Sequence, residues 1–198
     1  HAVHNAGLAP ADIGFLEAHG TGTPLGDPIE MNAVKGALGE RTEDNPLVVG
    51  AVKSNIGHLE LASGVAGIIK LVLSLNEEII PPNLHYSVPN PQLPMDWPVV
   101  FPTKPTPWKR GDRRRVAGIS AFGLSGTNAH LVIAEAPATV IASSDVRERP
   151  KHLLVVTGHT EAALDQAVSE AVTRLRSGVN LADAAHTANT GRARLAHR

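Results

Sequence analysis

Hydrophobic and polar positions alternate along this chain in a way that predicts strands leading through turns into helices. Residues 47–52 are apolar and mostly β-branched, which is typical of a strand covered on both faces. Small turn residues follow, and from 59 to 75 only Glu60 and Lys70 carry charge. This run predicts a long helix buried on nearly every face, and it is too short and too interrupted for a membrane span.

Two more apolar segments end in turns rich in glycine, threonine and serine. Residues 13–18 are expected to form a strand leading to His19, and residues 116–122 and 129–135 a hairpin of two strands. Loops at strand ends are where α/β folds build their sites. A histidine at the start of a helix, as expected for His58, tends to stay neutral and to donate a hydrogen bond. We therefore expect both histidines on one wall of one pocket.

Two polar segments have structural interpretations. Asp27, Pro28 and Glu30 stand in the order of an N-cap, a first helical residue and a capping box, so neither carboxylate is assigned to catalysis. Residues 81–107 hold nine of the fifteen prolines and predict an extended surface segment. The five basic residues in 109–115 fit either a solvated loop tip or a docking patch for an acidic partner.

The final third of the chain differs from the rest. Hydrophobic periodicity fades from 136 to 150, which predicts a linker or a domain boundary. A short strand over 152–157, a helix capped by Thr160 and a second helix over 181–189 are expected beyond it. The chain therefore divides into residues 1–136 and a small, partial α/β unit over 137–198.

Composition removes several classes of function. The chain has 198 residues with 42% apolar and 19% charged residues, as in ordinary globular proteins. A formal net charge of −1 and 3% aromatic residues disfavour nucleic acid and membrane partners. The absence of cysteine excludes a disulfide, a thiolate metal site and a cysteine nucleophile within this chain. No signal peptide or membrane span is evident, which predicts a cytoplasmic location.

Three motifs occur in order: residues 17–30 read EAHGTGTPLGDPIE, residues 52–58 read VKSNIGH, and residues 122–130 read FGLSGTNAH. Together they resemble the C-terminal half of the β-ketoacyl synthase (ketosynthase) domain of type I modular polyketide synthases. Residues 137–198 resemble the start of the linker toward the acyltransferase domain. The resemblance implies a thiolase-like α/β fold, layered around a mixed sheet.

The resemblance also implies a reaction and its residues. The family carries out a decarboxylative Claisen condensation between an acyl group on an active-site cysteine and a malonyl-type unit on an acyl carrier protein. By resemblance His19 and His58 polarise the extender carbonyl, and Lys53 supports the site electrostatically. Substrate and phosphopantetheine contacts fall on Thr21, Thr23, Phe122, Leu124 and Asn128. A turn-capping role is the alternative for the two threonines.

The implied partners follow from the same resemblance. They are the acyl carrier protein, the N-terminal half of the ketosynthase with its cysteine, the adjacent acyltransferase domain, and a second copy in a homodimer of the parent enzyme. The chain is expected to bind no cofactor directly, because phosphopantetheine belongs to the carrier protein. Two alternatives remain: a folded piece without activity of its own, and a two-histidine metal site. The metal site is disfavoured because no Asp, Glu or Cys has ligand spacing.

Overall fold

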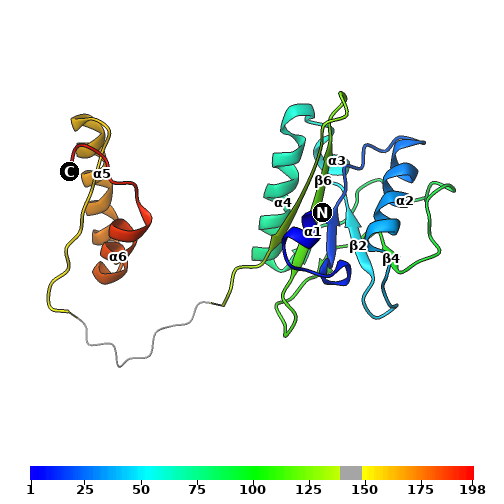
Figure 1. Ribbon diagram of the computed structural model, residues 1–198, viewed down its shortest axis with the longest axis horizontal. Helices are drawn as coiled ribbons and strands as arrows, with labels where there is room; N and C mark the ends of the chain where they lie inside the picture. The colour runs from blue at the N-terminus through cyan, green and yellow to red at the C-terminus, as the bar shows by residue number, and fades with distance from the viewer. Residues whose placement is uncertain (139–148) are drawn as a thin grey trace. The chain divides into compact units, whose positions relative to one another are not determined.

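The computed structural model describes residues 1–138 and 149–198, and the chain divides into two compact units, His1–Pro137 and Ala138–Arg198 (Figure 1). Most of the predicted linker, residues 139–148, lies outside the described residues. The two units are described separately below.

The first unit is built on a five-stranded mixed sheet in the order β4-β2-β1-β6-β7. The central strand β1 (Phe15–Glu17) runs parallel to β2 (Leu47–Gly50) and to β6 (Val116–Phe122). Strand β4 (Val99–Val100) extends the parallel part beyond β2, and β7 (Asn128–Ala134) pairs antiparallel with β6. The predicted mixed α/β architecture and the predicted hairpin are confirmed.

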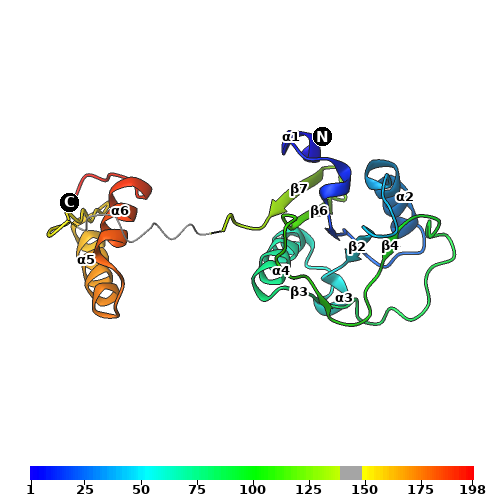
Figure 2. The same cartoon turned by 90° about the horizontal axis from the view of Figure 1, so that it is seen from below.

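Alternation along β1 divides the core into two layers, because successive strand residues point to opposite faces. Leu16 packs in a cluster with Met31 and Leu38 of helix α2 (Gly26–Leu38). Phe15 packs on the other face with Leu71 of helix α4 (Ser63–Glu77). Figures 1 and 2 show α2 and α4 flanking the sheet, with the short helix α1 (Ala2–Asn5) beside β7.

The helix predicted over 59–75 is observed as α4, which starts four residues later, and the predicted turn before it contains a short helix. Helix α3 (Lys53–Ile56) is followed by a 3₁₀ turn, η2 (Glu60–Ala62), and only then by α4. The backbone enters the left-handed region at Gly57 (φ 74°) and at Glu60 (φ 50°), which ends one helix before the next begins. His58 therefore lies in a loop and not at the start of the long helix.

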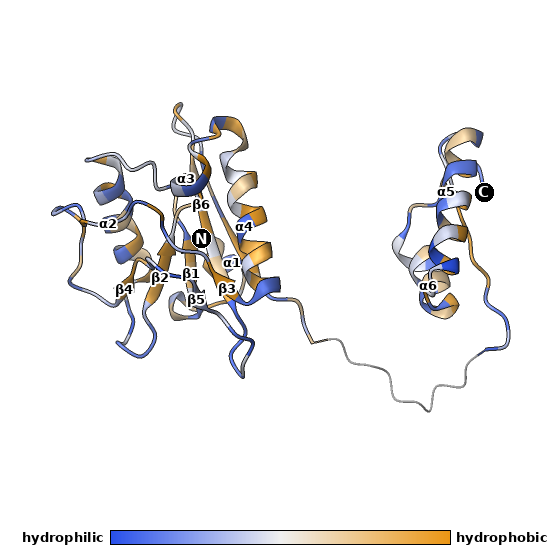
Figure 3. Cartoon of the chain, turned by 180° about the vertical axis from the view of Figure 1, so that it is seen from behind, coloured by the Kyte–Doolittle hydropathy of each residue, from blue (hydrophilic) through white to orange (hydrophobic). Residues whose placement is uncertain are grey.

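Helix α4 is also less buried than its composition predicts. One face packs on the sheet, while four apolar side chains on other faces are 43–58% exposed: Val65, Ile69, Val72 and Leu73. Figure 3 shows the apolar colouring running along α4. The expectation of burial on nearly every face is wrong, because only the face of α4 that packs on the sheet is covered by other described residues.

The proline-rich segment runs mostly without regular structure, as predicted. Its strands are short: the edge strand β4, and β5 (Thr106–Pro107), which pairs antiparallel with β3 (Ile79–Ile80). Proline is tolerated in such positions because an edge strand leaves some backbone N–H groups unpaired.

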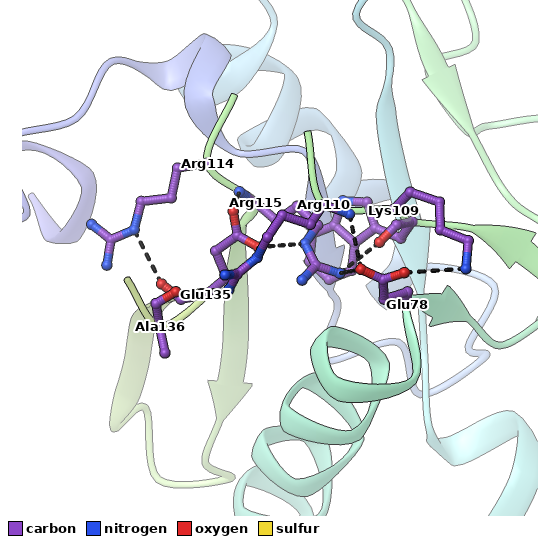
Figure 4. Close-up of polar contacts among 8 residues, drawn as sticks. Glu78, Lys109, Arg110, Arg114, Arg115, Glu135 and Ala136 are labelled. Atoms are coloured by element: carbon purple, nitrogen blue, oxygen red, sulfur yellow. Dashed lines mark hydrogen bonds and ion pairs between the residues drawn. The ribbon is translucent and has the colours of Figure 1, made fainter. Parts of the chain in front are cut away.

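The basic segment that follows is an internal clamp between the end of α4 and the end of β7 (Figure 4). The Arg115 Nε atom lies 2.7 Å from the Glu135 carboxylate, and the Lys109 Nζ atom 3.1 Å from that of Glu78. Arg110 and Arg114 also bond to Glu135. Residues 109–114 are exposed, as expected for a solvated loop, but four of the five basic side chains also bond within the fold.

The second unit contains helices α5 (Glu161–Arg176) and α6 (Leu181–Gly191), close to their predicted positions. The Thr160 hydroxyl caps α5 by accepting a hydrogen bond from the Ala163 N–H. The predicted strand over 152–157 is wrong, and one β-bridge joins Gly158 to His197. The Asn189 side chain of α6 takes the place of a partner strand, bonding to the Val155 N–H and the Leu153 carbonyl.

Candidate functional site

His19 stands directly beyond the buried end of β1. Its Nδ1 atom accepts a hydrogen bond from the Phe122 N–H at 3.3 Å, and its ring packs against the Phe122 ring with centroids 5.2 Å apart. Burial lowers the pKa of His19, and the positive charge of Lys53 lowers it further. A neutral ring whose Nδ1 accepts must carry its proton on Nε2, which leaves an N–H free to donate to a substrate oxygen.

His58 has the same arrangement from a different element. The Glu60 N–H donates to its Nδ1 atom at 3.0 Å, so a neutral ring carries its proton on Nε2, which can act as a donor. The rings of His19 and His58 lie 5.4 Å apart at an interplanar angle of 83°. The structure therefore brings the two predicted histidines together, even though His58 lies in a loop.

Lys53 is the first residue of α3 and is half-buried. Burial lowers the pKa of Lys53, while the nearby carboxylates of Glu17, Glu30 and Asp27 act in the opposite direction. The positive charge of Lys53 disfavours protonation of the His19 imidazole and so adds to the lowering of its pKa.

Glu30 has a role that the sequence pattern does not indicate. Helix α2 begins at Gly26 without a side-chain cap, so the predicted capping box with Asp27 is wrong. The two carboxylate oxygens of Glu30 instead accept from the backbone N–H groups of His19 (2.8 Å) and Gly20 (2.9 Å). Burial raises the pKa of Glu30, and these two hydrogen bonds oppose that rise. One buried carboxylate thus holds the His19 loop on α2.

Asp27 contributes a weaker contact to the same loop by accepting from the Gly22 N–H at 3.1 Å. Thr23 accepts from the Gly26 N–H at 3.0 Å, which is the turn-capping geometry considered as the alternative for this residue. Thr21 is exposed and lines a cavity of about 400 Å³ together with Lys53, Asp27 and Glu30. The rings of His19 and His58 lie outside the lining of this cavity.

The remaining predicted residues lie in or beside the β6–β7 hairpin. Phe122 is 39% exposed and contacts the His19 ring, whereas Leu124 is fully exposed in the loop. Asn128 pairs with Phe122 across the hairpin, and the turn is closed by the Gly123 N–H, which donates to the Thr127 carbonyl at 2.7 Å. The structure thus places Phe122 at the histidine pair and leaves Leu124 projecting away from the described core.

Glu17 is a second carboxylate whose environment sequence reasoning missed. It is 1% exposed, and its oxygens bond to the Val52 N–H and to the Lys70 ammonium group. The only signal in the sequence was a charged residue inside each of two apolar segments. Among residues 1–138 and 149–198 no group of three or more His, Cys, Asp or Glu side chains is placed to hold a metal ion. No helix in these ranges is long and apolar enough to span a membrane.

Two family descriptions match the chain. The family "Beta-ketoacyl synthase, C-terminal domain" matches residues 1–87, and the family "Ketoacyl-synthetase C-terminal extension" matches residues 89–198. The match to the extension covers more than half of the chain.

Curated relatives are polyketide synthases. Highly reducing polyketide synthase 40 of Fusarium mangiferae is 53% identical over 137 residues, which cover 68% of this chain and 6% of the relative. Erythronolide synthase EryA2 of Saccharopolyspora erythraea is 44% identical over 202 residues, covering 100% and 6%. Polyketide synthase GfsA of Streptomyces halstedii is 42% identical over 204 residues, covering 100% and 3%. The chain thus spans a small part of each relative.

Solved structures similar to this chain are ketosynthases of polyketide synthases. Ketosynthase twelve of the bacillaene polyketide synthase of Bacillus amyloliquefaciens is similar with a TM-score of 0.64 and 32% identity, covering 98% of this chain and 34% of that one. The ketosynthase from module 6 of the bacillaene synthase of Bacillus subtilis 168 has a TM-score of 0.64 and 36% identity, covering 98% and 34%.

Proposed function

The chain belongs to the β-ketoacyl synthase family, with the thiolase-like fold of polyketide ketosynthases, and we propose that it supplies two histidines and a lysine to a decarboxylative Claisen condensation. The single observation that carries this proposal is the paired arrangement of His19 and His58. Their rings lie 5.4 Å apart, and each Nδ1 is occupied by a backbone N–H. Two Nε2–H donors are thereby left to act on one substrate oxygen.

The chemistry uses these donors where negative charge develops. The malonyl-type thioester loses carbon dioxide, and the electron pair of the broken carbon–carbon bond moves onto its carbonyl oxygen as an enolate. Donors aimed at that oxygen stabilise the enolate more than the neutral carbonyl. The enolate carbon then attacks the acyl-cysteine thioester, a new carbon–carbon bond forms, and the thiolate leaves. The cysteine comes from outside this chain, which contains none.

Lys53 takes an electrostatic part in this proposal. Its charge keeps His19 in the neutral form that can donate through Nε2 while accepting through Nδ1. Thr21, Thr23, Phe122, Leu124 and Asn128 are proposed to contact the substrate and the phosphopantetheine arm. The contact of Phe122 with the His19 ring and the exposure of Thr21 support those assignments.

The proposed partners are those of a modular polyketide synthase. An acyl carrier protein delivers the extender on its phosphopantetheine arm, and the remaining ketosynthase residues, in a homodimer, provide the cysteine. Residues 1–136 are proposed to belong to the ketosynthase and residues 137–198 to the linker toward an acyltransferase domain. The exposed apolar side chains of α4 support an arrangement in which other parts of the ketosynthase cover this helix.

Replacing His58 by alanine in the ketosynthase that carries this sequence tests the proposal. Condensation is expected to fall by about 10²–10³-fold, the usual effect of losing one donor of this kind, while self-acylation of the cysteine changes far less. The two rates are measured by product formation and by mass spectrometry of the acyl-enzyme. His4→Ala, an exposed change on α1, serves as the control. An equal loss of both rates in His58→Ala would contradict the assigned role.

The chain by itself is expected to form no β-ketoacyl product from acyl thioester and malonyl-carrier substrates, because it lacks the nucleophile. The expected gain of activity on mixing with a cysteine-containing N-terminal half supports the proposal directly. Turnover by the isolated chain above a His19→Ala control would contradict it.

A further inference from the structure

We infer that Glu17 is a positioning residue of the condensing site, holding the segment that carries Lys53 through a hydrogen bond to the Val52 N–H, with Lys70 as its charge partner. This inference rests on the proposed function. It adds to that function a buried ion pair that lies behind the residues in contact with substrate.

The pair is enclosed within the first unit. Glu17 is 1% exposed and Lys70 is 8% exposed, and the Lys70 Nζ atom lies 2.7 Å from Oε2 of Glu17. The Lys70 ammonium group also lies 5.5 Å from the centroid of the Phe15 ring. The two charges come from β1 and α4, so the pair fixes the helix against the strand that leads to His19.

The second carboxylate oxygen of Glu17 contacts the backbone just before Lys53. Oε1 of Glu17 accepts from the Val52 N–H at 2.5 Å, and Val52 is the residue immediately before Lys53 at the start of α3. Strands β1 and β2 are in register at Glu17 and Gly50, so the two strand ends lie side by side. One side chain, two residues before His19, therefore sets the path of the backbone that enters Lys53.

The surrounding backbone leaves room for this pair. A Cβ atom at Gly50 would lie 2.9 Å from the Lys70 Nζ atom. A Cβ atom at Gly67 would lie 3.1 Å from Cγ of Glu17 and 2.5 Å from Cδ1 of Ile119. Any side chain larger than hydrogen at these positions would displace the pair or its neighbours.

Stability alone is a weak reason for such an arrangement. The cost of removing two charges from water offsets most of their attraction, and apolar replacements of buried pairs are often neutral or stabilising. Apolar side chains at positions 17 and 70 could pack equally well, but they could not accept the hydrogen bond from the Val52 N–H. The Val52 N–H is partly buried and needs an acceptor, and a carboxylate has enough oxygens to accept from both this N–H and the lysine.

The decisive comparison is between two uncharged double variants, Glu17→Gln/Lys70→Met and Glu17→Leu/Lys70→Met, in the ketosynthase that carries this sequence. Neither leaves a buried charge unpaired, and they differ in whether residue 17 offers an acceptor to the Val52 N–H. With Lys70 removed, the single oxygen of glutamine suffices. The single variant Glu17→Gln must instead leave either Val52 or Lys70 without an acceptor.

The glutamine double variant is expected to condense within about threefold of the unchanged enzyme, and the leucine double variant about 10²-fold more slowly, the scale of a misplaced catalytic group. Self-acylation of the cysteine is expected to change less than about threefold in both, since Glu17 acts here through the Lys53 segment. Rescue of the single variant Glu17→Gln by adding Lys70→Met would support the same assignment.

Glu135→Gln provides a matched control, because Glu135 forms an equally short pair with Arg115, 2.7 Å, in the clamp of Figure 4. It is expected to lower the unfolding temperature without separating condensation from self-acylation. Equal condensation rates in the two double variants would overturn the inference while leaving the proposed function intact. Absence of condensation in the unchanged enzyme would overturn both.

Discussion

The hydrogen bonds from Glu30 to the His19 loop lead to a prediction that can be measured at individual amides. Both oxygens of Glu30 are occupied, one by the His19 N–H at 2.8 Å and the other by the Gly20 N–H at 2.9 Å. Glu30→Gln keeps the shape of the side chain but replaces one oxygen with an NH₂ group. That group cannot accept, so one of the two backbone N–H groups loses its partner.

The magnitude follows from the burial of the site. Glu30 is 7% exposed, and leaving a buried donor without an acceptor costs about 1–3 kcal/mol. If this cost appears as easier local opening of the loop, amide exchange there speeds up by about 5- to 150-fold. Hydrogen–deuterium exchange of a peptide spanning residues 15–24, followed by mass spectrometry, measures this change in the intact ketosynthase.

Asp27→Asn is the matched control for this experiment. It removes one negative charge from the same helix, but Asp27 accepts only the Gly22 N–H through one oxygen, and asparagine keeps such an oxygen. Exchange of the same peptide is expected to change by less than about threefold. The reasoning is refuted if Glu30→Gln leaves exchange unchanged, or if Asp27→Asn accelerates it as much.

Two further predictions concern charge and packing. Lys53→Met is expected to raise the pKa of His19 part of the way back to that of a free histidine, because the lowering by burial remains but the lowering by the Lys53 charge is removed. An NMR titration of the His19 ring measures this change, with the exposed Lys104→Met as control. Because the folded pKa of His19 lies below its unfolded pKa, the stability that this residue contributes is present above the unfolded pKa and is lost as pH falls through the folded pKa. In Lys53→Met this loss is smaller, since the two pKa values lie closer together. Gly67→Ala is expected to destabilise the fold by about 1–3 kcal/mol in denaturant unfolding, since its Cβ would lie 2.5 Å from a neighbouring side chain. Gly36→Ala, on α2 with open space around it, is expected to stabilise the fold by about 0.5–1 kcal/mol, and the same sign for both would refute the packing argument.

Much of the fold and the histidine pair could be predicted from the sequence. Apolar segments indicated strands β1, β2, β6 and β7, and the turns after β1 and β2 contained His19 and His58. Parallel strands that are adjacent and in register end at the same edge of a sheet, so residues just beyond them meet there. The 5.4 Å separation of the rings depends in addition on helix α3 and on the left-handed backbone at Gly57, which lie between β2 and His58.

The carboxylates show where local rules stop being sufficient. Glu30 matched a capping box, which is a rule about the first turn of its own helix. In the folded chain two backbone N–H groups of the His19 loop lie close to α2 and require acceptors. The carboxylate of Glu30 accepts from both of them and does not cap its own helix. Glu17 and Lys70, 53 positions apart, form a pair that no local pattern indicates.

The sequence by itself thus determined the order of most elements and the loops that hold His19 and His58, because these depend on interactions between near neighbours. Only the tertiary structure decided which carboxylate binds which backbone group, where the helices on either side of His58 begin and end, and that the basic segment bonds to Glu78 and Glu135. Those outcomes depend on hydrogen bonds between buried polar groups of distant segments. Which groups form these bonds is set by the packing of the helices and strands, which brings particular donors and acceptors within hydrogen-bonding distance.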